Sequence, residues 1–415
     1  MIYFVTGFLL LCCAAEAALL IKDEGIIAGL LASAAQVRAA KGSGAVVRPA
    51  FSMICGKVKD RIPVLRRGGY TDDFVHIAFH PSGGLGDYIV SAKIVEELQA
   101  AAACRITVFC EHMEYGRAVY TPREGVDVCS YDGFEATRHS YDLALQAEHF
   151  IHVRNWNPKR LSALAPHLYQ KIDCLCSHWD TVYIPVRQQW WRERLRFAQC
   201  EIFGWNRWTE LRMGGVFSIE DMHITMPMDE AYRMRWEEMG LANRQYLTFN
   251  YGADKMRAEG TQIKLWPKAY YEKLLSELHR CRPGILLVQI GSGSCEKIAG
   301  ADLYILGQSL ELTKWVLAGS AVHIDCEGGL VHLAAQLDTR CVVMFGPTPV
   351  HMYGYAQNVN LQAEGCAYCM GLHKDWAYRC LRTGGRAACL ERIKPERVLE
   401  ACLGIVDEVC TLRKM

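Results

Sequence analysis

The segment 320–348 constrains the fold of this chain more than any other. Residues 320–324 are apolar and predict a buried strand, and the acidic, glycine-rich turn DCEGG follows at 325–329. Residues 330–337 then predict a helix, and residues 341–345 predict a second strand. A strand, a turn, a helix and a strand in this order predict a βαβ unit of a parallel sheet. Open α/β sheets bind ligands outside the carboxyl ends of their strands, where this turn lies.

A second glycine-rich turn lies far upstream. Residues 75–80 predict a strand, residues 81–87 (PSGGLGD) a loop, and residues 88–98 an amphipathic helix. One such turn can be purely structural. Two of them predict two doubly wound domains that face each other across a cleft. Strands and helices alternate over residues 246–345, which favours a parallel sheet in the second domain.

Four segments of the chain carry a family resemblance. They are GGLGDYIVSAKIVEEL at 83–98, KLWP at 264–267, CEGGLVHLAAQLDTRCVVMFGPT at 326–348 and CLERIKPERVLEA at 389–401. In this order they resemble the motifs of glycosyltransferase family 9, the heptosyltransferases. The resemblance implies an α/β, GT-B-like architecture, in which two Rossmann-like doubly wound domains follow an N-terminal helical extension.

We therefore expect five parts. They are an apolar and basic extension (1–72), an acceptor-side domain (73–228), a linker (229–243), a nucleotide-sugar-binding domain with a cysteine cluster (244–393) and a closing helix (394–415).

The extension allows three interpretations. Residues 2–21 are apolar apart from Glu16, and residues 35–70 carry eight Lys and Arg against the single Asp60. An apolar segment followed by a basic one suits peripheral contact with the inner face of the cytoplasmic membrane. A helix packed on the first domain and a cleaved signal peptide are the alternatives. The family resemblance does not extend to this region.

Composition excludes some functions. The chain is 51% hydrophobic and 22% charged, as in globular proteins, and its net charge of +1 argues against a nucleic-acid partner. Its nineteen Cys are scattered through strand-like and helix-like segments rather than framing a small domain. We interpret them as mostly reduced thiols of a cytoplasmic protein.

Asp87 is the candidate catalytic residue. Glycosyl transfer with inversion needs a carboxylate that takes the proton of the acceptor hydroxyl. An Asp at the start of a helix can instead serve as a cap of that helix. The resemblance implies that the catalytic base of the family occupies this Gly-Asp position.

The candidate residues for binding the nucleotide sugar follow mainly from the resemblance. They are Gly84, Gly86, Lys264, Glu296, Glu327, Gly328, Gly329 and His332. Lys264 would offset the charge of a diphosphate. Glu296 would hold ribose hydroxyls, or simply favour a helix N-terminus. The chain departs from the family pattern twice, because Glu327 stands where the family usually has Asp, and Ala253 lies where the family often has a hydroxyl.

A cysteine cluster closes the second domain. Cys366, Cys369, Cys380 and Cys389 include one Cys-x-x-Cys pair, which suits a structural Zn or Fe site. Reduced thiols under a loop, or a disulfide, are the alternatives. The chemical step itself is expected to require no cofactor.

These features together predict an inverting glycosyltransferase. The donor expected from the resemblance is ADP-heptose, and the acceptor is a saccharide or lipid-linked saccharide such as lipopolysaccharide core. The alternatives are a non-catalytic binding or scaffold protein of the same fold, and a transferase with another nucleotide sugar or a protein acceptor. Aromatic and Arg residues in 155–215 either pack helices or form a wall against sugars.

Overall fold

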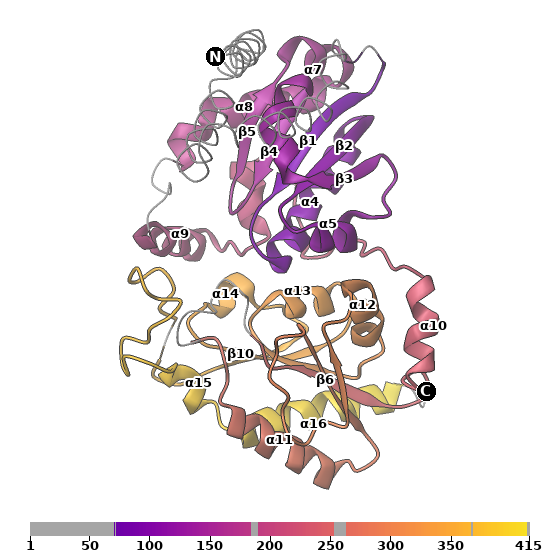
Figure 1. The fold of residues 1–415 in the computed structure, drawn as a ribbon. Coiled ribbons are helices and arrows are strands. Elements are labelled where there is room, and N and C mark those ends of the chain that lie inside the picture. Colours follow the sequence, from indigo (N-terminus) through magenta and orange to yellow (C-terminus); the bar gives the residue numbers. More distant parts are fainter. Residues whose placement is uncertain (1–69, 71, 184–189, 253–262, 367, 413–415) are drawn as a thin grey trace, which may run out of the picture. The chain divides into compact units, whose positions relative to one another are not determined.

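The computed structural model describes Tyr70 and residues 72–183, 190–252, 263–366 and 368–412. The N-terminal extension and Ala253 therefore lie outside the described residues. Within the described part of the chain, two separate sheets each form an α/β domain (Figure 1).

The first sheet has the strand order β3-β2-β1-β4-β5. Its strands are β1 (Val75–Pro81), β2 (Cys104–Cys110), β3 (Val126–Ser130), β4 (Leu143–Ala147) and β5 (Ile151–Trp156). Strands β1 to β4 are parallel, as the pattern predicted. Strand β5 is antiparallel to β4, because the three residues between them cannot form the long crossover that a parallel pair requires.

The helices of this domain are α4 (Leu85–Ala101), α5 (Met113–Tyr120), α6 (Phe134–Thr137), α7 (Pro158–Leu164), α8 (Pro166–Tyr183) and α9 (Trp190–Phe203), with 3-10 turns η2 (Tyr131–Gly133), η3 (Arg138–Ser140) and η5 (Thr209–Gly215). Helices α4, α5 and α6 lie between its strands in the chain, and helices α7, α8 and α9 follow the last strand. Helix α10 (Ala231–Glu238) follows and has no buried residue.

The second sheet has the order β11-β10-β9-β6-β7-β8 and is parallel throughout. Its strands are β6 (Tyr246–Asn250), β7 (Leu286–Gly291), β8 (Leu303–Leu306), β9 (His323–Cys326), β10 (Cys341–Phe345) and β11 (Val359–Gln362). Its helices are α11 (Lys268–Cys281), α12 (Leu310–Ala318), α13 (Gly329–Ala335), α14 (Val350–Tyr353), α15 (Ala388–Arg392) and α16 (Pro395–Leu412). The expected βαβ unit is thus β9-α13-β10.

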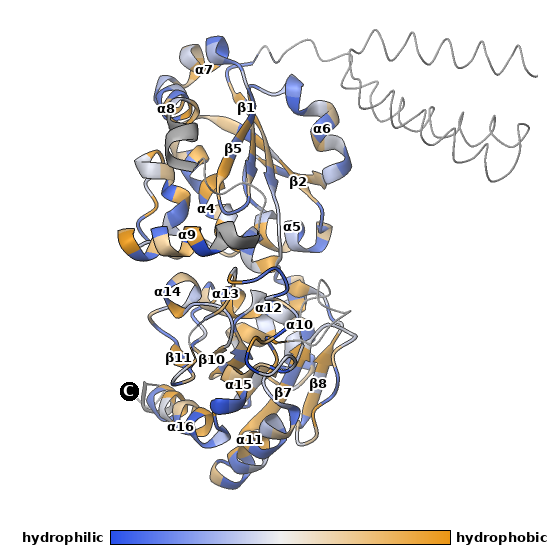
Figure 2. Cartoon of the chain, turned by 90° about the vertical axis from the view of Figure 1, so that its left-hand side faces the viewer, coloured by the Kyte–Doolittle hydropathy of each residue, from blue (hydrophilic) through white to orange (hydrophobic). Residues whose placement is uncertain are grey.

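The core of each domain follows from the sequence pattern. All residues of β1 and β10 are buried, as continuous apolar strands of a sheet covered on both faces must be. Helices such as α16 carry both hydrophilic and hydrophobic residues, so one side packs and the other meets water (Figure 2). In the described residues no helix is long and apolar enough to cross a membrane.

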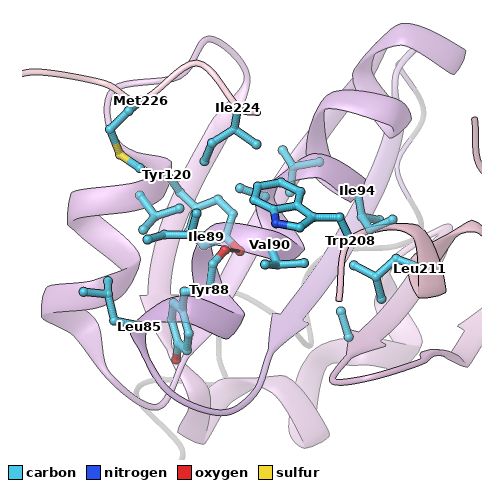
Figure 3. Close-up of a cluster of buried hydrophobic side chains, with 14 of the residues drawn as sticks. Leu85, Tyr88, Ile89, Val90, Ile94, Tyr120, Trp208, Leu211, Ile224 and Met226 are labelled. Carbon is cyan, nitrogen blue, oxygen red and sulfur yellow. Dashed lines mark hydrogen bonds between the residues drawn. The ribbon is translucent and has the colours of Figure 1, made fainter. Parts of the chain in front are cut away.

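Helix α4 is central to the first domain. Its side chains Ile89, Val90 and Ile94 lie in one cluster with the indole of Trp208, which comes from the loop before η5 (Figure 3). Trp208 is fully buried and donates its Nε1–H to the hydroxyl of Tyr355 in the second domain. This packing fixes the start of α4, and with it the residues of the first glycine-rich turn.

Candidate active site

The carboxyl ends of strands from both sheets border one cavity of about 830 Å³. Its walls include most of the candidate residues named above: Gly84, Gly86, Asp87, Lys264, Glu327, Gly328, Gly329 and His332. They come from the two glycine-rich turns and from the loop before α11. The position agrees with the general placement of ligand sites in open α/β sheets.

Asp87 is held at the start of α4 by donors on both of its oxygens. Its Oδ2 accepts the backbone N–H of Gly84 at 2.9 Å, and its Oδ1 accepts Nη2 of Arg207 at 2.9 Å. Burial raises the pKa of Asp87, but the charges of Arg207 and His149 and the hydrogen bonds from Arg207 and Gly84 together outweigh it and hold the pKa below its ordinary value. The side chain keeps a third of its surface exposed and lines the cavity. Asp87 therefore serves in the cap of α4 and also presents a charged carboxylate to the cavity.

Arg207 and Glu210 were not predicted from the sequence. Arg207 is almost fully buried behind Asp87, and its Nη1 donates to Glu210 Oε1 at 3.0 Å. Glu210 is equally buried and also pairs with Arg196. Arg196 and Arg207 belong to the aromatic and Arg-rich stretch 155–215, which gave the only sequence signal, and nothing in the spacing points toward Asp87.

Lys264 and Glu327 form an ion pair inside the cavity. Lys264 Nζ lies 2.5 Å from Glu327 Oε2, and the two side chains are 17% and 8% exposed. Burial raises the pKa of Glu327, but Lys264 lowers it by more, so the carboxyl is charged and its pKa lies below the ordinary value. The Glu that replaces the family's usual Asp thus reaches the Lys predicted to bind the diphosphate.

The two glycine-rich turns touch each other. A Cβ on Gly329 would lie 2.9 Å from Cβ of Leu85, and a Cβ on Gly86 would lie 2.5 Å from Cδ2 of His332. Helices α4 and α13 pack together at this point. The close packing of the two domains therefore requires glycine at Gly86 and Gly329, whether or not these residues also contact a ligand.

His332 is a buried member of this contact. Its Nδ1 lies 2.7 Å from the hydroxyl of Tyr355, and burial lowers its pKa, so the imidazole is neutral near pH 7. Asp87 and Glu327 both act electrostatically on the ring, which can donate or accept a hydrogen bond according to its tautomer.

Comparison with known proteins identifies the second domain and the loops before it. Residues 219–374 match the model of glycosyltransferase family 9 (heptosyltransferase). The chain carries a glycosyltransferase family 9 domain. The resemblance seen in the sequence motifs is confirmed, and the protein is a glycosyltransferase. No curated protein matches the chain in sequence.

Solved structures of family 9 glycosyltransferases and heptosyltransferases share the fold. ADP-heptose lipopolysaccharide heptosyltransferase II of E. coli is 18% identical, with a TM-score of 0.51 over 80% of this chain and 99% of its own. A family 9 glycosyltransferase of Veillonella parvula is 16% identical, with a TM-score of 0.53 over 82% and 100%. The iron-containing heptosyltransferase TibC of E. coli is 13% identical, with a TM-score of 0.51 over 81% and 77%. The GT-B-like architecture expected from the sequence is confirmed.

Glu296 lies apart from the other candidates of this family 9 domain. Its side chain is 58% exposed, its Oε1 lies 2.5 Å from Nζ of Lys268, and it is not among the residues that line the cavity. Buried Asp325 does line the cavity, where both of its oxygens accept Nδ2 of Asn250 at 3.1 and 3.2 Å. Of the carboxylates in this domain, Asp325 is therefore better placed than Glu296 to meet a ligand.

The four candidate metal ligands lie around a second cavity of about 270 Å³. Among the residues that the structure describes, however, no three His, Cys, Asp or Glu side chains are arranged to hold a metal ion. Cys366, Cys369, Cys380 and Cys389 are all free thiols. The expectation of metal-binding cysteines is not supported. Burial raises the pKa of the Cys389 thiol to about 12.

Three Trp residues of the aromatic stretch, among those whose side chains the structure describes, pack against other parts of the protein. Trp208 is in the core, Trp156 stacks on Tyr169, and Trp205 stacks on Phe203. None of these three Trp residues lines the larger cavity. Of the two roles expected from the sequence, packing therefore describes these three residues.

Proposed function

We propose that this protein is an inverting glycosyltransferase that moves heptose from ADP-heptose to a saccharide acceptor such as lipopolysaccharide core. One observation carries the proposal: a charged carboxylate, Asp87, and a Lys that can bind phosphate, Lys264, line the same cavity at the glycine-rich turns of two Rossmann-like domains. Donor binding and proton removal are the two tasks that such a reaction sets.

The chemistry is a single displacement. The acceptor oxygen forms a bond to the anomeric carbon of the donor sugar, and the bond from that carbon to the diphosphate breaks, its electron pair leaving on the diphosphate oxygen. Asp87 takes the proton of the acceptor hydroxyl, which makes that oxygen the better nucleophile. Lys264 stabilises the negative charge that grows on the leaving diphosphate.

The pairing of Lys264 with Glu327 affects how the donor diphosphate would bind. A diphosphate that binds Lys264 would share this cation with Glu327 or displace it, and the Glu327 carboxylate would repel the diphosphate. We therefore expect Glu327 to turn toward a hydroxyl of the donor sugar when the diphosphate binds. That exchange would keep the buried carboxylate hydrogen-bonded, as a buried charge requires.

The first-domain side of the cavity suggests which acceptor groups are tolerated. Exposed Glu111, Glu114 and Glu148 all line it. Carboxylates repel phosphate or carboxylate groups on an acceptor. We expect core saccharides that lack phosphate near the reacting hydroxyl to be better acceptors than their phosphorylated forms.

The test of donor binding is thermal stabilisation by ADP, UDP, GDP and CMP, repeated on Lys264→Ala. A ligand at 100 times its Kd stabilises a protein by about 2.7 kcal/mol. A shift with ADP alone that is lost in Lys264→Ala supports the proposal. The absence of a shift with every nucleotide would contradict it and favour a non-catalytic protein of the same fold.

The basic N-terminal extension suggests where in the cell the protein acts. We propose that the enzyme works in the cytoplasm at the inner face of the membrane, because residues 35–70 are strongly basic and a lipid-linked acceptor would lie there. Sedimentation of the full chain with anionic vesicles, compared with neutral vesicles, tests this. Equal recovery in both supernatants would contradict it.

A further inference from the structure

Arg207 holds the carboxylate of Asp87 in place, and it lies outside the four sequence motifs. Arg207 approaches Asp87 from inside the first domain, with Nη2 at 2.9 Å and Nε at 3.3 Å from the same oxygen, Oδ1. The second oxygen, Oδ2, is held by the Gly84 N–H. Both oxygens are thus bound on the protein side, which fixes the plane of the carboxylate against the cavity.

Arg207 is itself held on several sides. Its Nη1 donates to Glu210, its Nη2 also donates to the carbonyl of Glu148 at 2.8 Å, and its backbone N–H donates to the carbonyl of Met352 at 2.9 Å. The next residue, Trp208, is anchored in the core against α4 (Figure 3). A guanidinium fixed in this way cannot follow a carboxylate that moves, so it determines where the carboxylate stays.

The charges around Arg207 balance. Arg196 and Arg207 are matched by Glu210 and Asp87 in one chain of ion pairs. Because Glu210 is buried between the two Arg, Arg207 keeps a partner when Asp87 loses its charge on taking a proton. An isolated Arg at 2% exposure would be costly at that moment.

We infer that Arg207 is a positioning residue for the catalytic base, supported from behind by Glu210. The inference rests on the proposed function for its kinetic part. Arg207 holds Asp87 ionised and oriented before the acceptor binds, and Glu210 keeps Arg207 in place while the proton is transferred. Charged and titratable groups from each neighbouring element also face Asp87: His149 after β4, and His332 on α13.

Two variants separate charge from geometry. Arg207→Lys keeps the positive charge but cannot donate two bonds to one oxygen while also reaching Glu210. We expect a kcat for transfer from ADP-heptose that is lower by about 10-fold, with KM for the donor and the acidic limb of the pH profile unchanged. Arg207→Gln removes the charge, while Glu210 keeps Arg196. We expect a kcat lower by roughly 100-fold, as for a misplaced catalytic group, and an acidic limb that moves to higher pH.

Asp142→Asn provides the matched control. Asp142 is 4% exposed and pairs with Arg160 at 2.8 Å, at the amino end of β4, away from the cavity. The Asp142→Asn variant should have a lower melting temperature, and the pH profile of its kcat should be unchanged. Should Arg207→Gln behave as this control does, the role of Arg207 is structural and the inference is overturned.

A carbon-13 NMR titration of the Asp87 carboxyl, assigned with Asp87→Asn, decides the inference without turnover. A higher Asp87 pKa in Arg207→Gln than in the parent chain supports it, and an unchanged pKa overturns it. If the parent chain transfers no sugar from any nucleotide donor, the proposed function fails on that result alone, and the titration still tests the link between Arg207 and Asp87.

Discussion

Lys264 Nζ lies 2.5 Å from Glu327 Oε2, so the cation expected to meet the donor diphosphate is already paired within the protein. The pair is shielded from water, because Glu327 is 8% exposed and the pKa of its carboxyl is held below its ordinary value by Lys264. Under the proposed function, donor binding would therefore exchange one partner of Lys264 for another, rather than capture a phosphate with an unpaired side chain.

The first prediction concerns the stability of this pair. Lys264→Met leaves the Glu327 charge buried without its partner, and we expect it to lower the free energy of unfolding by about 3 kcal/mol. Adding Glu327→Gln should restore most of the loss, because the uncompensated charge is then gone. Urea unfolding of the two single variants and the double variant measures the coupling. Losses that simply add would show that the pair contributes little.

The second prediction concerns Asp87. Asp87→Asn keeps an oxygen for the Gly84 N–H but cannot take a proton from an acceptor, so we expect turnover to fall by about 10² to 10⁴. Stabilisation by ADP should remain, since Lys264 is untouched. Initial rates and thermal shifts on the same preparation test both statements. Turnover near the parent level would remove Asp87 from the mechanism.

The sequence predicted the organisation of the sheets well. The boundaries of β10 agree with the strand expected at 341–345, because a continuous apolar segment bounded by turns signals a buried parallel strand directly. The edge strands β3 and β11 were missed. Neither is strongly apolar, since an edge strand can be half exposed, and so their periodicity is weak.

The candidate site was predictable only where its residues lie in glycine-rich turns or family motifs. Asp87, Lys264 and His332 were expected, and they line one cavity. Arg207 reaches Asp87 across 120 residues of chain, and such a pairing leaves no local pattern to read. The pairing of Lys264 with Glu327 was missed for the same reason, because Glu327 was expected to bind the ligand and not to pair with Lys264.

A third prediction follows from the contact between the two turns. Gly86→Ala places a methyl group 2.5 Å from Cδ2 of His332, where a shift of the imidazole would break its hydrogen bond to Tyr355. Overpacking of this kind costs about 1–3 kcal/mol. Gly284→Ala is the control, because a Cβ there has no neighbour within 4 Å. Differential scanning calorimetry should show a lower melting temperature for Gly86→Ala only. Equal values for both variants would mean that α4 and α13 separate easily.

The last prediction concerns acid stability and Glu210. Its pKa is lowered from 4.5 to about 2, because Arg196 and Arg207 outweigh the effect of burial. A depressed carboxyl pKa contributes stability above the unfolded pKa, and that contribution is lost as the pH falls from about 4.5 toward 2. The contribution at neutral pH is on the order of 3 kcal/mol. Glu210→Gln should therefore be less stable than the parent chain at pH 7 and show a smaller further loss between pH 4.5 and 2. Urea midpoints measured across this range decide the matter: parallel curves for the two proteins would show that Glu210 is not linked to acid unfolding, and that Arg207 draws its support from elsewhere.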